Sequence, residues 1–357
     1  MGAAGNFFED FRLGQEFRHA PPRTVTEADA TLYAALYGSR FPLHGARTFA
    51  KKLGFAETPL DDLLVFHVVF GKSVPDVSLN AVANLGYASG VMGAPVFPGD
   101  TLSARSTVIG LKENSNRKTG VVWVKTVGVN QDGRVVAEYA RWVMVRKRDE
   151  NAPAPAPHVP DLPAAVPAAA LIVPEGFDRA GYDTGLSGDP RLWEDYAKGE
   201  RIDHADGATI EEAEHMMATR LYHNTARVHF NQHAEKNGRF GRRIVYGGHV
   251  ISIARALSFN GLANAFRIAA VNAGAHVAPT FAGDTVYAWS EVLETIVLPG
   301  RDDVGALRLR TIATKDRACA DFPARVGENY DPAVVLDFDY TVLIPRRIRD
   351  SRIAGIV

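Results

Sequence analysis

The sequence repeats itself, and this constrains the fold more than any other feature. Residues near the start of the chain recur 185 positions later without a gap, and a second block recurs at an offset of 184. The first block aligns Phe8, Asp10, Phe11, Gly14, Thr24, Glu27, Ala28, Tyr37 and His44 with Trp193, Asp195, Tyr196, Gly199, Thr209, Glu212, Ala213, Tyr222 and His229. The second block aligns Pro95, Phe97, Gly99, Asp100 and Thr101 with Pro279, Phe281, Gly283, Asp284 and Thr285. Two copies at nearly constant offsets indicate a duplicated unit, and we predict a pseudo-symmetric pair rather than a solenoid.

A proline- and alanine-rich stretch separates the two copies. Residues 150–174 read ENAPAPAPHVPDLPAAVPAAALIVP, a composition that favours an extended path and cannot build a core. The chain of 357 residues is also long for a single core. We therefore predict an N-terminal half at 1–149, a linker at 150–174 and a C-terminal half at 175–357.

The two halves share one order of predicted elements. Each begins with a Thr that is followed three residues later by Glu, at 24–27 and at 209–212, which is the capping-box spacing that starts a helix. An apolar segment follows in each half, at 63–70 and at 250–257. The second of these segments is opened by two glycines and reads as a mostly buried helix.

Long strand-like runs complete each half. They cover residues 101–111, 121–130 and 135–145, and then residues 285–298, 305–314 and 334–344. Asp132-Gly133 predicts a hairpin turn between two of them. One buried helix wrapped by an antiparallel sheet is the hot-dog arrangement. We therefore predict an α+β double hot dog in which the two halves join sheet to sheet.

Charge and cysteine content exclude several classes of function. The 40 basic and 41 acidic side chains leave a net charge of -1, so nucleic acid and anionic membranes are not expected as partners. The single cysteine, Cys319, allows no internal disulfide and no thiolate metal cage. The sequence shows no signal-like start and no apolar run of about 18 residues. We expect a soluble cytoplasmic protein.

The densest set of polar groups lies in residues 222–249, beside the helix that should be buried. Asn224 and His229 are five residues apart, and the Tyr-Gly-Gly of 246–248 opens the helix. The free N–H groups of a helix N-terminus stabilise a carbonyl oxygen as it gains negative charge. A neutral imidazole nearby can take a proton from water. Together these groups suit the conjugate addition of water to an unsaturated thioester.

This segment resembles the motif of the MaoC-like, (R)-specific enoyl-CoA hydratase family, G-D-x-N-P-L-H followed by P-I-x-H-G. In that family the Asp and His position and deprotonate the water, and the last Gly lends its N–H to the thioester oxygen. The motif His falls on His229 and the Asp on Asn224, and the final His-Gly pair falls on Tyr246-Gly247. The resemblance thus implies His229, Asn224 and Gly247 as catalytic residues.

The motif carboxylate is missing from both halves. In the first half His44 takes the His position, while Ser39 and Phe41 stand where the family has Asp and Asn. In the second half Asn224 would orient the water for His229. We prefer this hypothesis because an amide can hold a water by hydrogen bonding without titrating.

The alternative is a carboxylate from elsewhere in the chain. The candidates are Glu235, Asp61 and Asp62. His67 and His249 are interpreted as helix residues rather than ligands.

The chain is most similar to one branch of this family, the mesaconyl-CoA hydratases or β-methylmalyl-CoA dehydratases. TRLYHNTARVHFN in the second half and LYGSRFPLH in the first look like variants of the motif in that branch. This resemblance implies the reversible hydration of mesaconyl-CoA to β-methylmalyl-CoA in acyl-CoA carbon assimilation, as in an ethylmalonyl-CoA-type pathway. It also implies coenzyme A as part of the substrate and no separate cofactor. No metal is expected, because no set of His, Asp and Glu at short helical spacing recurs in the sequence.

Mesaconyl-CoA ends in a carboxylate, which calls for a cation, and an Arg fork suits a carboxylate better than Lys does. Arg227 is preferred, with Arg40 and Arg47 as the other candidates. The residues predicted to bind substrate are Arg227, Tyr246, Gly248, His44 and Arg47. A homodimer is expected from exposed sheet edges. A hot-dog acyl-CoA thioesterase and a catalytically silent acyl-CoA-binding protein remain as alternatives.

Overall fold

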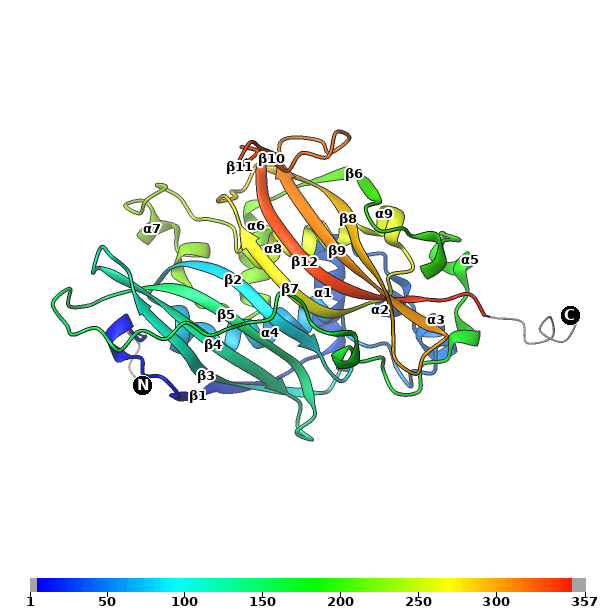
Figure 1. Ribbon diagram of the computed structural model, residues 1–357, viewed down its shortest axis with the longest axis horizontal. Helices are drawn as coiled ribbons and strands as arrows, with labels where there is room; N and C mark the ends of the chain where they lie inside the picture. Colours follow the sequence, from blue (N-terminus) through cyan, green and yellow to red (C-terminus); the bar gives the residue numbers. More distant parts are fainter. Residues whose placement is uncertain (1–4, 349–357) are drawn as a thin grey trace, which may run out of the picture.

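The fold is one ten-stranded antiparallel sheet that wraps two buried helices, seen in a computed structural model that describes residues 5–348 (Figure 1). The strand order is β1-β3-β4-β5-β2-β7-β12-β9-β8-β6. The first five strands of this order come from the N-terminal half and the last five from the C-terminal half. This is the predicted double hot dog.

The main elements follow the same order in both halves, namely one strand, several helices and then four long strands, and the second half adds short elements. The first half holds η1 (Phe8–Asp10), β1 (Glu16–Thr24), α1 (Glu27–Tyr37), α2 (Pro42–Gly45), α3 (Arg47–Lys52), α4 (Asp62–Ser73), η2 (Val74–Ser78), β2 (Ala81–Met92), β3 (Thr101–Glu113), β4 (Thr119–Val129) and β5 (Val135–Arg146). Before its first strand the second half holds η3 (Ala168–Ala170), η4 (Arg179–Gly181), α5 (Thr184–Ser187) and η5 (Trp193–Asp195). It continues with β6 (Arg201–Thr209), α6 (Glu212–Leu221), η6 (Arg227–His229), α7 (Gln232–Glu235), α8 (Gly247–Leu257), α9 (Phe259–Leu262), β7 (Arg267–His276), β8 (Thr285–Val297), β9 (Val304–Lys315), β10 (Arg325–Val326), β11 (Asn329–Tyr330) and β12 (Val334–Pro345).

The six predicted strands are confirmed as β3, β4, β5, β8, β9 and β12, and the two apolar segments lie in α4 and α8. The predicted capping boxes are wrong. Thr24 and Thr209 end strands, where their hydroxyls bond Thr101 and Thr285 at 2.8 Å each. Helix α1 is instead capped by Thr26, which exchanges hydrogen bonds with Asp29, and α6 begins after Glu211 with no side-chain cap.

The two halves join through strands that the sequence pattern did not predict. β2 and β7 pair in the middle of the sheet, with Tyr87 opposite Gly274 and Val91 opposite Ala270. β2 reads AVANLGYASGVM, rich in small residues, and its pairing with β5 contains three register shifts. These features hide the alternation by which a strand is recognised.

The helices of the two halves also touch each other directly. All twelve residues of α4 are buried. A side chain at Gly71 would collide with the carbonyl oxygen of Tyr222, so the glycine lets α4 approach the segment that follows α6. The first half therefore forms one wall of the region that carries the motif of the second.

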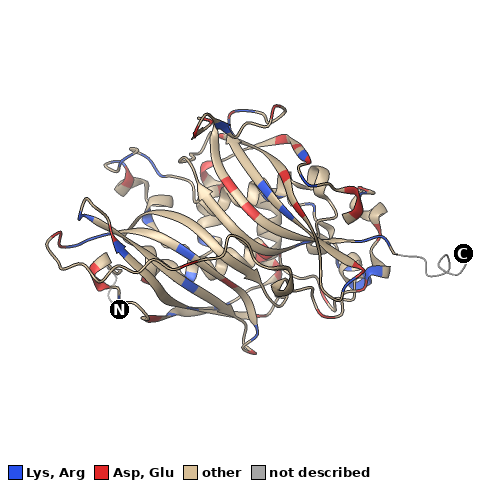
Figure 2. Ribbon diagram, viewed as in Figure 1, with Lys and Arg blue, Asp and Glu red and all other residues tan. Residues whose placement is uncertain are grey.

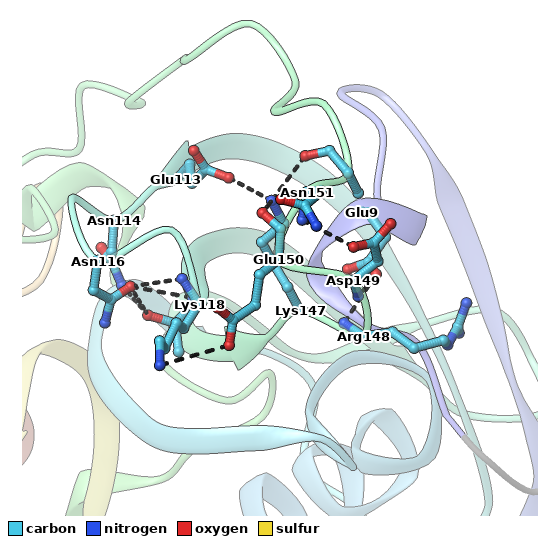
Figure 3. A network of polar contacts seen from close by, with 12 residues as sticks. Glu9, Glu113, Asn114, Asn116, Lys118, Lys147, Arg148, Asp149, Glu150 and Asn151 are labelled. Carbon is cyan, nitrogen blue, oxygen red and sulfur yellow. Dashed lines mark hydrogen bonds and ion pairs between the residues drawn. The ribbon is translucent and has the colours of Figure 1, made fainter.

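The segment predicted as a linker, residues 150–174, runs across the sheet face opposite the helices (Figure 1). Lys147 fixes its start, because its Nζ donates to Glu113 at 2.7 Å and to the carbonyl of Ala152 at 2.8 Å (Figure 3). His158 then forms a bridge with Leu111. The N–H of Val166 donates to Asn272 Oδ1 at 2.9 Å, so the proline-rich chain follows a defined path.

Basic and acidic residues are interspersed along the ribbon (Figure 2). On the sheet several form pairs between neighbouring strands, including Arg308 with Asp339 and Arg310 with Asp337. Within residues 5–348, no helix is long and apolar enough to cross a membrane.

Candidate active site

The predicted catalytic segment lies between the end of α6 and the start of α8. His229 ends the short turn η6, and its ring packs edge-on against Tyr246 with centroids 5.6 Å apart. Tyr246 is the N-cap of α8, and Gly247 is the first residue of that helix. The structure thus brings the imidazole to the N-terminus of the buried helix.

One hydrogen bond fixes the tautomer of His229. Its Nδ1 lies 3.0 Å from the carbonyl oxygen of Ile244. A carbonyl can only accept, so Nδ1 carries the proton and Nε2 is left as a free base. Burial lowers the pKa of His229 from 6.5 to about 4. At neutral pH the ring is therefore uncharged and able to accept a proton from water.

Gly247 is confined by a second imidazole. A side chain at this position would collide with the ring of His276, which comes from β7. The open N–H groups of the first turn of α8 give this place partial positive charge. A thioester oxygen here would be stabilised as it becomes an oxyanion.

His276 and Tyr87 were not singled out from the sequence. His276 Nε2 and the Tyr87 hydroxyl share a hydrogen bond of 3.3 Å across the junction of the two halves. Burial first, and then the neighbouring His229, lower the pKa of His276 to about 4. Only the pairing of β2 with β7 brings these residues together, and no sequence motif marks it.

Asn224 is buried, and its Oδ1 accepts the backbone N–H of Ala226 at 3.0 Å. This leaves the amide nitrogen as a donor. Asn224 also lines a cavity of about 510 Å³ between the halves, together with Lys72, Arg220 and Phe230. His229 is not among the described residues that line this cavity, so a shared water between Asn224 and His229 stays a prediction.

The first half repeats the histidine but not the oxyanion position. His44 Nδ1 donates to the carbonyl of Pro59 at 3.1 Å, which matches His229 and Ile244 at the repeat offset of 185. Asp62 stands at the position of Gly247. It accepts from Arg267 Nε at 3.1 Å and from the N–H of Ile268 at 3.0 Å. The helix start of the first half is thus occupied by a buried ion pair.

The three carboxylates considered as substitutes for the motif Asp have other surroundings. Asp62 forms an ion pair with Arg267. Burial raises the pKa of Asp62, although the Arg267 guanidinium acts to lower it. Asp61 caps α4 by accepting the N–H of Leu63 at 2.9 Å. Glu235 lies in α7, and its carboxylate packs near Gly238. The structure favours none of them as the partner of His229.

The predicted substrate-binding residues fall in different environments. Gly248 is buried against Tyr246 and His67, and the Tyr246 hydroxyl lies 3.3 Å from His67 Nδ1. Arg227 is exposed beside His229. Arg47 is on the surface of the first half, where it pairs with Glu27 at 2.6 Å.

Behind the helix start lies a buried polar network between the halves. The interpretation of His67 and His249 as helix residues is confirmed, and both rings take part in this network. His67 Nε2 bonds Ser252 at 3.1 Å, and Tyr37 bonds His249 Nδ1 at 2.9 Å. Within residues 5–348, no cluster of three or more His, Cys, Asp or Glu side chains is placed to hold a metal ion.

Comparison with known proteins gives the family. Residues 2–325 match the family described as mesaconyl-CoA hydratase. A β-methylmalyl-CoA dehydratase of Chloroflexus aurantiacus is 67% identical over 96% of this chain and 98% of its own length. A mesaconyl-CoA hydratase of Cereibacter sphaeroides is 58% identical over 96% of this chain and 99% of its own.

Solved structures agree in fold. A MaoC domain dehydratase from Chloroflexus aurantiacus superposes with a TM-score of 0.95 at 66% identity, covering 97% of this chain and 99% of that one. A Mycobacterium tuberculosis protein with a double hotdog fold gives 0.75 at 22% identity, covering 97% of this chain and 100% of that one, and shows the fold alone. With the sequence matches, these results establish that the chain belongs to the mesaconyl-CoA hydratase family.

Proposed function

We propose that this chain is a hydro-lyase that reversibly hydrates mesaconyl-CoA to β-methylmalyl-CoA. The family match and the two close relatives support this reaction. The structural observation that carries it is His229, a neutral imidazole whose proton is fixed on Nδ1 by Ile244 and which lies beside the N-terminus of α8.

In hydration, Nε2 of His229 takes a proton from water while the water oxygen bonds to the carbon β to the thioester. The electron pair of the double bond moves to the thioester oxygen, which becomes an enolate oxyanion. The N–H of Gly247 holds this oxygen, and the amide of Asn224 orients the water. The imidazolium then returns the proton to the α carbon, so that one water has been added. Dehydration runs through the same steps in reverse.

A direct assay tests this function. Mesaconyl-CoA is added to the purified protein, and the absorbance of the enoyl thioester is followed together with free thiol. Loss of the enoyl absorbance without thiol release is the expected result. Thiol release would indicate a thioesterase instead, and unchanged absorbance despite binding would indicate an acyl-CoA-binding protein.

We further propose a cytoplasmic homodimer that uses no cofactor beyond the coenzyme A of its substrate and serves acyl-CoA carbon assimilation of the ethylmalonyl-CoA type. Support for a dimer comes from β1 and β6, the two edge strands of the sheet. An unpaired edge strand can add a strand from a second copy. Light scattering after size-exclusion chromatography gives the mass in solution, and a monomer would contradict this part of the proposal.

A further inference from the structure

A lone arginine is buried inside the first half. Arg141, on β5, is 0% exposed, and its guanidinium lies 4.3 Å from the centre of the Phe70 ring. Its Nη2 donates to the hydroxyls of Ser73 at 2.8 Å and Ser78 at 3.3 Å. Nε and Nη1 are buried as well, and in the described part of the chain neither has a hydrogen-bond partner.

Such an arrangement is costly for a folded protein. Buried polar groups are normally paired, and a buried charge without a counter-ion destabilises the fold. The groups that act on Arg141 electrostatically are tyrosines, and burial lowers its pKa. A guanidinium nevertheless stays protonated in proteins. Its free N–H groups therefore call for an acceptor that the described chain does not supply.

A second buried donor lies next to it. The hydroxyl of Tyr139 has no acceptor in good hydrogen-bond geometry among the described residues. Its polar neighbours include the hydroxyls of Thr126 and Ser73, which already bond Ser106 and Phe70. Tyr139 is two residues before Arg141 on β5, so both side chains point to the same face of the sheet. Burial raises the pKa of Tyr139 to about 12. The hydroxyl is therefore protonated at neutral pH and able to donate.

Arg141 belongs to a row of side chains that leads to the candidate active site. It stands opposite Tyr87 in the pairing of β5 with β2, and Tyr87 stands opposite Gly274 in the pairing of β2 with β7. Opposed residues in antiparallel strands share a face. Gly274 leaves room for the ring of Tyr87. The Tyr87 hydroxyl then reaches His276, whose ring packs on Gly247.

We propose that Arg141 and the Tyr139 hydroxyl bind the carboxylate at the far end of the acyl chain. This inference rests on the proposed function. In mesaconyl-CoA the carboxylate is attached to the carbon that receives the water. With the thioester oxygen at Gly247 and the carboxylate at Arg141, the two ends of the short chain are held on either side of the reacting carbons. One of the free guanidinium N–H groups, on Nε or Nη1, and the Tyr139 hydroxyl can each donate one hydrogen bond to the carboxylate, and the bond from the guanidinium is charge-assisted.

Other cations fit this role less well. Arg227, the residue preferred from the sequence, is exposed to solvent and is not desolvated. Lys72 lines the 510 Å³ cavity beside Asn224, but its Nζ already donates to the carbonyl oxygen of Pro21. Lys72 therefore serves as a comparison in the experiment.

The test pairs two substrates that differ in the carboxylate alone. Tiglyl-CoA carries a methyl group where mesaconyl-CoA has the carboxylate. Arg141→Met should lower kcat/KM for mesaconyl-CoA about 10- to 100-fold, the value of one charge-assisted hydrogen bond, and should leave kcat/KM for tiglyl-CoA unchanged or higher. Arg146→Met, at the exposed end of the same strand, is the control and should change neither value.

Thermal melting separates ligand binding from a structural role. Because Arg141→Met removes a buried charge without a counter-ion, Tm of the ligand-free protein should stay unchanged or rise. A structural role predicts a lower Tm and equal losses of kcat/KM on both substrates, and that result would overturn the inference.

The Tyr139→Phe variant removes one atom, the hydroxyl oxygen. It should lower kcat/KM for mesaconyl-CoA alone by about 5-fold, which is roughly the value of one neutral hydrogen bond. It tests the site even if Arg141→Met does not fold.

Two further arms exclude other sources of the anion. Inhibition by free coenzyme A should be the same for the wild-type protein and Arg141→Met, and a weaker inhibition of the variant would indicate a phosphate site instead.

The Lys72→Met variant should change kcat/KM for mesaconyl-CoA and for tiglyl-CoA by the same factor. A loss for mesaconyl-CoA alone would overturn the assignment to Arg141. Failure of the wild-type protein to hydrate either thioester would contradict the proposed function itself.

Discussion

Tyr37 and Tyr222 occupy the same position in the two repeats, 185 residues apart, and their hydroxyls share a hydrogen bond of 2.7 Å. His67 and Ser252 are separated by the same offset and also bond each other, at 3.1 Å. Residues related by the duplication can touch only where the pseudo-twofold axis passes between them. The axis therefore runs through this buried network, and the candidate active site lies to one side of it.

The Tyr37–Tyr222 bond should contribute to the joining of the halves. We expect Tyr37→Phe and Tyr222→Phe each to lower the free energy of unfolding by about 1 kcal/mol, and the double variant to cost less than the sum. Urea denaturation of the four proteins measures this coupling. If the loss in free energy of unfolding of the double variant equalled the sum of the two single losses, the two hydroxyls would not interact with each other.

Gly247 should not tolerate a side chain. Gly247→Ala places a methyl group against the His276 ring and displaces the helix start, so kcat should fall by about 100-fold or more, as on loss of an oxyanion donor. Gly45→Ala is the matched control, because its added Cβ meets no atom within 4 Å. Full activity of Gly247→Ala would remove this helix start from the mechanism.

Asn224 should affect turnover through its free amide nitrogen. Asn224→Ala is expected to lower kcat about 10- to 100-fold, with a smaller change in KM, because a positioned water is lost. Asn231 accepts the N–H of Ala234 at 3.0 Å, much as Asn224 accepts that of Ala226. If Asn231→Ala lowered kcat as strongly, the effect would belong to the loop and not to a water.

Acid should unfold this protein through its buried histidines. Burial lowers the pKa of His67 and His249 to about 3 and that of His204 to about 4, below the ordinary 6.5. Below pH 6.5 the unfolded chain binds protons that the folded chain does not, so stability falls as the pH falls. Below pH 6.5, each of these rings should lower the free energy of unfolding by about 1.4 kcal/mol per pH unit.

Denaturant unfolding at pH 7, 6 and 5 measures this dependence in a range where most carboxylates stay ionised. In the His249→Gln variant, the number of protons taken up on unfolding should fall by about one, so the free energy of unfolding should depend less steeply on pH. Equal stability at pH 7 and pH 5 would show that these rings are not buried as neutral groups.

The sequence predicted the parts of the fold that repeat or that form long strand-like runs. β3, β4 and β5 and their counterparts are such runs, and the offset of 185 aligned His44 with His229. The central strands β2 and β7 escaped because small residues and register shifts obscure their pattern. Pairing between distant strands also leaves no local signal.

The candidate site shows the same division. His229 and Gly247 carry a family motif, whereas His276 and Tyr87 meet only because β7 and β2, from different halves, are neighbours in the sheet. The preference for Arg227 followed its closeness to His229 in the sequence. Closeness in sequence says nothing about whether a side chain is desolvated, and Arg227 is exposed.

The most direct test of the account compares His229 with its counterpart in the other repeat. His44 and His229 make the same bond from Nδ1 to a backbone carbonyl, at 3.1 and 3.0 Å, but only His229 precedes a helix that begins with glycine. Mesaconyl-CoA hydration is measured for folded His229→Asn and His44→Asn. We predict a loss of kcat of about 100- to 10,000-fold for His229→Asn and near wild-type turnover for His44→Asn. Full hydration by His229→Asn, or equal losses in both variants, would contradict the assignment of His229 as the base.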